Sequence, residues 1–127
     1  MSTPAETITT YFDAIRHKDA AAWVACFASD GVAYDPVHAP VRQGHEAHRA
    51  FFKGVTGLFA ELDFRPGEPL VCGNRAAVTF TARCLARNGR TVEVQGIDVF
   101  RFDTDGRILQ VEGYWDPAPL FAAAGAG

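Results

Sequence analysis

The sequence lacks several features that would assign it to a class at once. Only two of its 127 residues are lysine and three are cysteine, and the net charge of −3 comes with no basic cluster. A surface for nucleic acid or anionic lipid is therefore not expected. No run of about 18 apolar residues is present, so no transmembrane helix is expected. Residues 1–6 carry neither the basic region nor the apolar core of a signal peptide.

Nor does the sequence contain a recognisable metal or redox motif. Cys26, Cys72 and Cys84 are far apart and odd in number, and no CxxC pair occurs. We expect all three to be reduced core residues of a cytoplasmic protein. His45 and His48 are too close together for an HExxH motif, so no metal site is expected.

What is present describes one ordinary globular domain with many aromatic residues. Apolar residues make up 48% of the chain and charged residues 21%, which excludes a disordered chain or a coiled coil. A chain of this length can bury a core without disulfides. Ten Phe, three Tyr and two Trp suit either a large core or an apolar pocket.

Helical patterns occupy the first part of the chain. Residues 3–6 form a capping box and are followed by apolar residues at helical spacing, which predicts a helix to about His17. Asp19 is expected to cap a second, short helix. A third helix is expected over residues 45–55. Its inner side is expected to carry Ala47, Ala50, Phe51 and Val55.

Strand patterns follow. A turn is expected at residues 29–31 and a short strand at 32–35, before a loop. The longest alternating segments are residues 75–87, 90–103 and 107–115. Asn88-Gly89 is a strong hairpin signal between the first two. Helices followed by an antiparallel meander indicate a single α+β domain over residues 1–116, with the sheet curled around the helices. Residues 117–127 are expected to form a loose C-terminal tail.

Asp98 interrupts the apolar face of its strand. Alternation places it on the same side as Val94 and Phe100, opposite Gln95. A carboxylate on that face either takes up a proton, with a raised pKa, or is paired with an arginine or backbone donor for structural reasons.

Two further polar residues stand out, each with an ordinary explanation. Asp35 ends a short strand directly before Pro36, where an Asp-Pro pair commonly starts a turn. Tyr11 lies on the buried face of the first helix, where a core tyrosine often bonds to a backbone carbonyl.

Taken together, these three residues and their surroundings resemble the Δ5-3-ketosteroid isomerase family. The resemblance covers about residues 5–116. The matching segments are Thr10-Tyr11-Phe12, Tyr34-Asp35-Pro36, Ile97–Asp103, Asp105–Ile108 and Tyr114-Trp115. The resemblance implies a cone-shaped, curled antiparallel β-sheet wrapped around three N-terminal helices, a fold shared with nuclear transport factor-like proteins.

The resemblance also implies roles for the three residues. Asp35 would be the general base, and Tyr11 and a protonated Asp98 would donate hydrogen bonds to an oxyanion; a carboxylic acid kept neutral at pH 7 is a known property of that family. The implied reaction moves a C=C bond of a 3-oxo-Δ5-steroid-like ketone to the conjugated Δ4 position without a cofactor. The implied apolar wall consists of Trp115, Phe51, Phe80, Phe100 and Val94.

Some positions depart from the family pattern and leave alternatives open. Phe27 and Phe52 stand where some members have further tyrosines, and His38 stands where a glycine is expected. His38 either alters the pKa of Asp35 or is a solvated loop residue. One alternative function is a polyketide cyclase-like enzyme that uses Asp35 or His38 as its acid/base. Another is a non-catalytic binder of a hydrophobic polycyclic ligand.

The outward side of the strands predicts a partner. Leu85, Ile97 and Val99 fall on that side, and apolar residues that cluster on neighbouring strands indicate an interface. We expect a homodimer through the outer sheet face, as the resemblance also implies. The alternative is that the three residues are scattered and individually tolerated.

Overall fold

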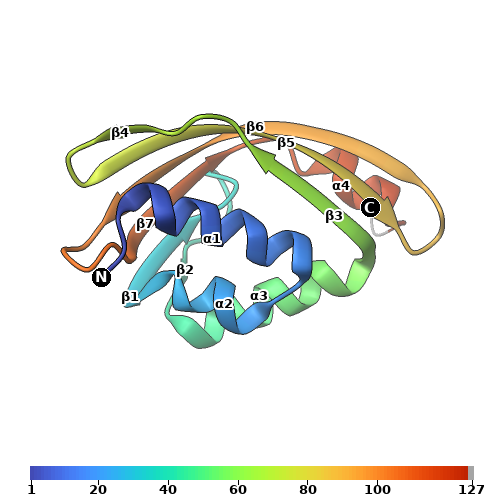
Figure 1. Cartoon of the computed structure of the whole chain (residues 1–127). Helices are drawn as coiled ribbons and strands as arrows, with labels where there is room; N and C mark the ends of the chain where they lie inside the picture. Colours follow the sequence, from blue (N-terminus) through green and yellow to red (C-terminus); the bar gives the residue numbers. More distant parts are fainter. Residues whose placement is uncertain (126–127) are drawn as a thin grey trace.

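The computed structural model describes residues 1–125, in which a curled sheet arches over a layer of helices (Figure 1). In chain order the elements are α1 (Pro4–His17), α2 (Ala20–Ala25), β1 (Phe27–Tyr34), β2 (Arg42–Gln43), α3 (His45–Leu58), β3 (Phe59–Pro66), β4 (Leu70–Cys72), β5 (Arg75–Ala86), β6 (Thr91–Phe102), β7 (Ile108–Tyr114) and α4 (Ala118–Ala123). The α+β class and the cone-shaped sheet predicted from the sequence are confirmed.

The first two helices begin where their caps predict. Thr3 accepts a hydrogen bond from the Glu6 amide at 3.1 Å, and the Glu6 carboxylate accepts one from the Thr3 amide at 2.9 Å, which completes the capping box. Asp19 accepts a hydrogen bond from the Ala22 amide at 3.0 Å at the start of α2. Both helices pack beneath the sheet and set the position of Tyr11 on α1.

Helix α3 is longer than predicted, and the face that it buries differs from the predicted one. It continues to Leu58, and its buried residues are His48 and Phe52, whereas Ala50 is exposed. The predicted inner position of Ala50 is therefore wrong. His48 can be buried on this helix because its Nε2 atom lies 2.9 Å from the Gly31 carbonyl oxygen, so the polar edge of the ring has a hydrogen-bond partner.

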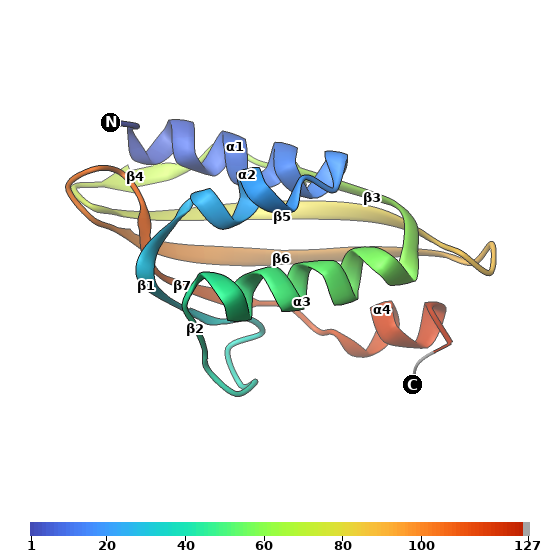
Figure 2. The ribbon, with the colours of Figure 1, turned by 90° about the horizontal axis from the view of Figure 1, so that it is seen from below.

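The strands form a sheet in the order β2-β1-β7-β6-β5-β3, and β4 pairs with one end of β5. β5 and β6 form the longest ladder. Figure 2 shows that α1, α2 and α3 lie on the same face of the sheet. The predicted alternation on β6 is confirmed, because Asp98 and Phe100 are buried while Gln95 and Ile97 are exposed. One pairing is not antiparallel: β1 runs parallel to β7.

The turn predicted at residues 29–31 is wrong, because β1 continues through it. The pairing register with β7 shifts between Phe27 and Val32, which marks a bulge. A Cβ atom on Gly31 would lie 2.5 Å from the Ile108 carbonyl oxygen, so the close approach of the two backbones requires glycine there.

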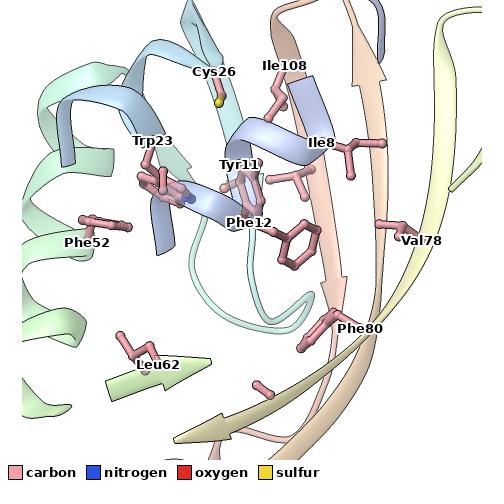
Figure 3. Packing of buried hydrophobic residues seen from close by; sticks show 14 of the residues in the cluster. Ile8, Tyr11, Phe12, Trp23, Cys26, Phe52, Leu62, Val78, Phe80 and Ile108 are labelled. Atoms are coloured by element: carbon pink, nitrogen blue, oxygen red, sulfur yellow. The ribbon is translucent and has the colours of Figure 1, made fainter. Parts of the chain in front are cut away.

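Aromatic rings fill the space between the helices and the sheet (Figure 3). Trp23 stacks on Phe52 with 4.9 Å between ring centroids, and Tyr11 meets Phe12 edge to face at 5.2 Å. Such pairs add about 0.5–1.5 kcal/mol each beyond the burial of their area. This cluster forms the wall from which the candidate site is built.

The cysteines are free, as expected, but only two lie in the core. Cys26 and Cys84 are buried, and burial raises their pKa to about 12 and about 11. Cys72 is exposed, so its predicted core position is wrong. It ends β4 opposite Arg75 at a hairpin on the edge of the fold.

The C-terminal segment differs from the loose tail that its composition predicted. Ala118–Ala123 form α4, and Leu120 is only 2% exposed. The Asn88 side-chain amide donates to the Ala123 carbonyl at 3.0 Å, which ties α4 to the β5–β6 hairpin. The last two residues of the predicted tail, 126–127, lie outside the described residues. Among the helices of the described chain, none has the length and apolar composition needed to cross a membrane.

Candidate active site

Asp35 lies where β1 ends, beside the end of β7. The parallel pairing of the two strands brings Tyr34 level with Glu112, so the chain that leaves β7 passes close to Asp35. The Trp115 indole N–H donates a hydrogen bond to Asp35 Oδ1 at 2.6 Å. The Asp35–Pro36 peptide bond is cis. The charge-assisted hydrogen bond from Trp115 holds the Asp35 carboxylate in one orientation.

Asp98 approaches the same place from β6. It is paired with Gly113 of β7 and is 4% exposed. A Cβ atom on Gly113 would lie 3.0 Å from Asp35 Cγ and 3.1 Å from Asp98 Oδ1. The two carboxyl groups therefore share the space that the missing side chain of Gly113 leaves open.

Tyr11 completes the polar group from the helix side. It is 2% exposed and meets the Phe100 ring edge to face at 5.4 Å. Burial is the main cause of the raised pKa of both Tyr11 and Asp98, and no hydrogen bond is among the causes of either shift. Both side chains border a pocket, so both can form hydrogen bonds with a ligand there.

The pocket that contains the three residues is otherwise mainly apolar. Its free volume is about 70 Å³. The predicted wall residues Trp115, Phe51 and Phe80 line it, whereas Phe100 and Val94 are not among the described residues that do. Phe100 lies behind Tyr11, and Val94 pairs with Ala82 further along the sheet.

Other residues of the wall were not predicted. They come from all the helices and from β3, and include Ile15, Trp23, Val55, Leu62, Phe64 and Leu120. Helical spacing could have indicated Ile15, which follows Tyr11 by one turn. Leu62 and Leu120 had no such signal, because their position depends on how β3 and α4 close over the helices.

The two carboxyl groups differ in proton affinity. Burial, together with the nearby charge of Asp35, raises the pKa of Asp98 well above its usual value. Burial also raises the pKa of Asp35, but the Trp115 hydrogen bond and the Arg42 charge lower it. Asp98 therefore retains its proton to higher pH than Asp35 does. Burial raises the pKa of Tyr11 well above its usual value, so the phenol stays a donor.

Arg42 is a charged neighbour that the sequence analysis missed. Its guanidinium carbon lies 3.8 Å from the centroid of the Phe51 ring, and its Nε atom donates to His48 Nδ1 at 3.0 Å. Burial lowers the pKa of His48 to about 4, so this ring is neutral at pH 7. His48 then accepts from Arg42 and donates through Nε2 to the Gly31 carbonyl oxygen. An arginine in a proline-containing loop gave no signal of this burial.

The remaining candidate groups do not join the site. His38 is exposed in the loop after Pro36. In the part of the chain that the structure describes, no three His, Cys, Asp or Glu side chains come together as a metal site requires.

The amino-acid sequence is similar to a known protein family and to a named enzyme. A family model described as "SnoaL-like domain" matches residues 8–111. The chain is 28% identical over 113 residues to a steroid Δ-isomerase of Nocardioides simplex, a match that covers 89% of each chain.

Solved structures agree with the fold. One is an NTF2-like protein of unknown function from Burkholderia pseudomallei, with a TM-score of 0.81, 26% identity and 98% of both chains covered. Another is an epoxide hydrolase/cyclase-like enzyme with a role in pyran ring formation in the polyether salinomycin. It has a TM-score of 0.80 and 26% identity, with 91% of this chain and 92% of that chain covered.

Proposed function

The chain belongs to the SnoaL-like domain family, and from this premise we propose that it is a cofactor-free isomerase of β,γ-unsaturated ketones, of the steroid Δ-isomerase type. One observation carries the proposal: two carboxyl groups of different proton affinity and a buried phenol meet at an apolar pocket. Groups whose environments separate their pKa values are suited to distinct acid and base roles.

In the proposed reaction Asp35 is the base. Its ionised carboxylate removes a proton from the carbon between the carbonyl and the C=C bond and returns it two carbons further along. The Trp115 hydrogen bond keeps the carboxylate in place during this transfer. General-base catalysis of this kind contributes about 10²- to 10⁴-fold in rate.

Tyr11 and protonated Asp98 hold the oxygen of the enolate between the two proton transfers. Both side chains border the pocket, and no hydrogen bond is among the causes of either raised pKa. In an apolar site one such donor is worth roughly 10²- to 10³-fold in rate. The low polarity that raises the pKa of Asp98 also strengthens this bond.

The proposal is tested by mixing the protein with a 3-oxo-Δ5-steroid and following the absorbance of the conjugated product. Asp35→Asn should lose nearly all activity, because an amide is no base. Asp98→Asn should retain more activity than Asp98→Ala, because the amide still donates a hydrogen bond. Equal loss in Asp98→Asn and Asp35→Asn would contradict the assigned roles.

A second candidate is a cyclase-like reaction on a polycyclic ketone, with Asp35 as the acid/base. The similarity to the epoxide hydrolase/cyclase-like enzyme of salinomycin formation favours it. Turnover of a polycyclic aromatic ketone, with no isomerisation of the steroid, would select this reaction. Specific binding of a polycyclic ligand with no turnover of either substrate would identify a binding protein instead.

A further inference from the structure

Helix α4 contributes one side chain to the lining of the pocket. Leu120 is 2% exposed and lines the same pocket as Tyr11 and Asp35. α4 packs against β6, and Figure 2 shows it as a separate short helix after the end of the sheet. The chain reaches it directly from Trp115, which holds Asp35. Leu120 is thus the contribution of the C-terminal segment to the site.

The space left beside Leu120 is too small for a polycyclic ligand. The free volume is about 70 Å³, whereas a cavity of about 150 Å³ is known to hold benzene. Pockets for larger organic ligands measure about 300–1,000 Å³. A ligand with several fused rings therefore needs more space than this pocket offers.

Outside the pocket, α4 is held by its packing against β6 and by hydrogen bonds to the β5–β6 hairpin. Asn88 Nδ2 donates to the Ala123 carbonyl at 3.0 Å, and an Arg90 guanidinium nitrogen lies 3.5 Å from the Ala122 carbonyl. At the start of α4, which has six residues, Asp116 Oδ1 accepts a hydrogen bond from the Ala118 amide at 3.0 Å. A helix this short is not stable alone, so its position depends on these contacts and on Leu120.

We propose that Leu120 occupies the place of the ligand, and that a polycyclic ketone or phenol binds only when α4 leaves the pocket mouth. Leu120 then determines which ligands enter, because the binding free energy of a ring system must exceed the free energy needed to displace Leu120. The ligand class rests on the proposed function. The exclusion between Leu120 and the ligand rests on the volume and contacts of the pocket.

The first test weakens the attachment of α4 without touching the pocket. Asn88→Asp removes the donor to Ala123 but keeps Oδ1, which accepts from the Arg90 amide at 2.9 Å. The matched control is Asn74→Asp, which removes a similar amide-to-carbonyl bond, to Phe102, on another hairpin. Binding of equilenin, a planar steroidal phenol, is followed by its fluorescence.

Asn88→Asp should bind equilenin about two- to ten-fold more tightly than the unmodified chain, because the open form becomes more populated. Leu120→Ala should also tighten binding, and Asn74→Asp should leave it unchanged. If Leu120 is instead a wall that the ligand packs against, Leu120→Ala weakens binding and Asn88→Asp does not tighten it. That pattern would overturn the proposal.

Hydrogen exchange gives a second readout, independent of turnover. The Phe121 and Ala124 amides donate to the Pro117 and Leu120 carbonyls at 3.1 and 3.2 Å. They should exchange faster when equilenin binds, and faster in Asn88→Asp without ligand. Unchanged or slower exchange in α4 on binding would overturn the proposal.

The outcomes separate this inference from the proposed isomerase. If no variant isomerises a β,γ-unsaturated ketone, but Asn88→Asp and Leu120→Ala bind equilenin more tightly, the isomerase assignment fails and the role of α4 stands. If the steroid is isomerised and α4 stays closed on binding, the isomerase stands and this inference fails. Failure of equilenin to bind even to Leu120→Ala would also overturn the inference.

Discussion

Residue 113 shows how much depends on a missing side chain. A Cβ atom there would meet both Asp35 and Asp98. Gly113→Ala should therefore displace the Asp35 carboxylate from its bond with Trp115 and lower isomerase activity at least ten-fold, since a small misplacement of a catalytic group costs up to about 10²-fold. Steady-state kinetics with the steroid ketone measure this effect.

The control for that variant is Gly54→Ala on α3. A Cβ atom on Gly54 would meet no other atom within 4 Å. This substitution should raise the free energy of unfolding by about 0.5–1 kcal/mol and leave activity unchanged. Equal activity in Gly113→Ala and the unmodified chain would show that the two carboxyl groups do not need the space above Gly113.

Asp98 should make the fold less stable as pH rises. Burial raises its pKa well above the usual value, so the unfolded chain releases this proton near pH 4 while the folded chain keeps it. Stability is then lost from about pH 4 up to the folded pKa. Asp98→Asn has no proton to lose, so urea unfolding at pH 7 should show a higher free energy of unfolding than in the unmodified chain.

At the scale of elements, His48 ties α3 to both β1 and β2 through Gly31 and Arg42. Its folded pKa is about 4, against an ordinary value of 6.5. The unfolded chain therefore gains a proton between about pH 6.5 and 4 that the folded chain does not, and stability falls as the pH falls. The shift corresponds to about 3 kcal/mol.

Urea unfolding between pH 7 and pH 4 checks this expectation. The control is His48→Gln, which keeps a donor and an acceptor but does not titrate. It should lose less stability than the unmodified chain over this range. Asp98 changes the free energy of unfolding with pH in the opposite direction, but it does so in both proteins, so its effect cancels in the comparison. Parallel curves for the two proteins would exclude a depressed pKa at His48.

The elements that the sequence predicted well are those whose pattern is local. Strand alternation is sufficient to place Asp98 inside, and helical spacing places Tyr11 inside. The bond between Asp35 and Trp115 joins residues 80 apart through the parallel pairing of β1 and β7. No local pattern contains such a contact.

The sequence analysis missed features that depend on contacts between residues far apart in the chain. Arg42 is half-buried because Phe51 and His48 from α3 pack around it, which cannot be inferred from the residues beside it in the sequence. α4 forms in a segment rich in Ala and Pro, and its Leu120 side chain is buried at the pocket. Ser29–Gly31 form a bulge rather than a turn because β7 lies alongside to pair with β1.

At the scale of the whole molecule, the outer sheet face predicts a homodimer. Strand pairing places Ile97 beside Tyr114, which are 44% and 48% exposed, and Val99 beside Ala77 and Leu70 on the next strands. A contiguous apolar surface of this kind is well suited to a two-fold contact. Light scattering at micromolar concentration should give about twice the chain mass of 13.7 kDa.

The double variant Ile97→Lys, Val99→Lys tests the choice of face. It should convert the dimer to a monomer, because four added charges would face one another across the two-fold axis. A dimer that survives both substitutions would move the interface to another surface. A mass near that of one chain for the unmodified protein would remove the dimer altogether.

The bond between Trp115 and Asp35 also gives the protein an optical signal of its own. Of its two indoles, Trp23 is buried among aromatic rings, while Trp115 donates to a carboxylate that the proposed reaction protonates and deprotonates. In a Trp23→Phe background the remaining emission should shift in wavelength as Asp35 titrates, since the indole loses a charged acceptor. The same residue leads into α4, so the emission should respond again when a ligand enters. Proton transfer and entry could then be timed separately by stopped flow, without any added label.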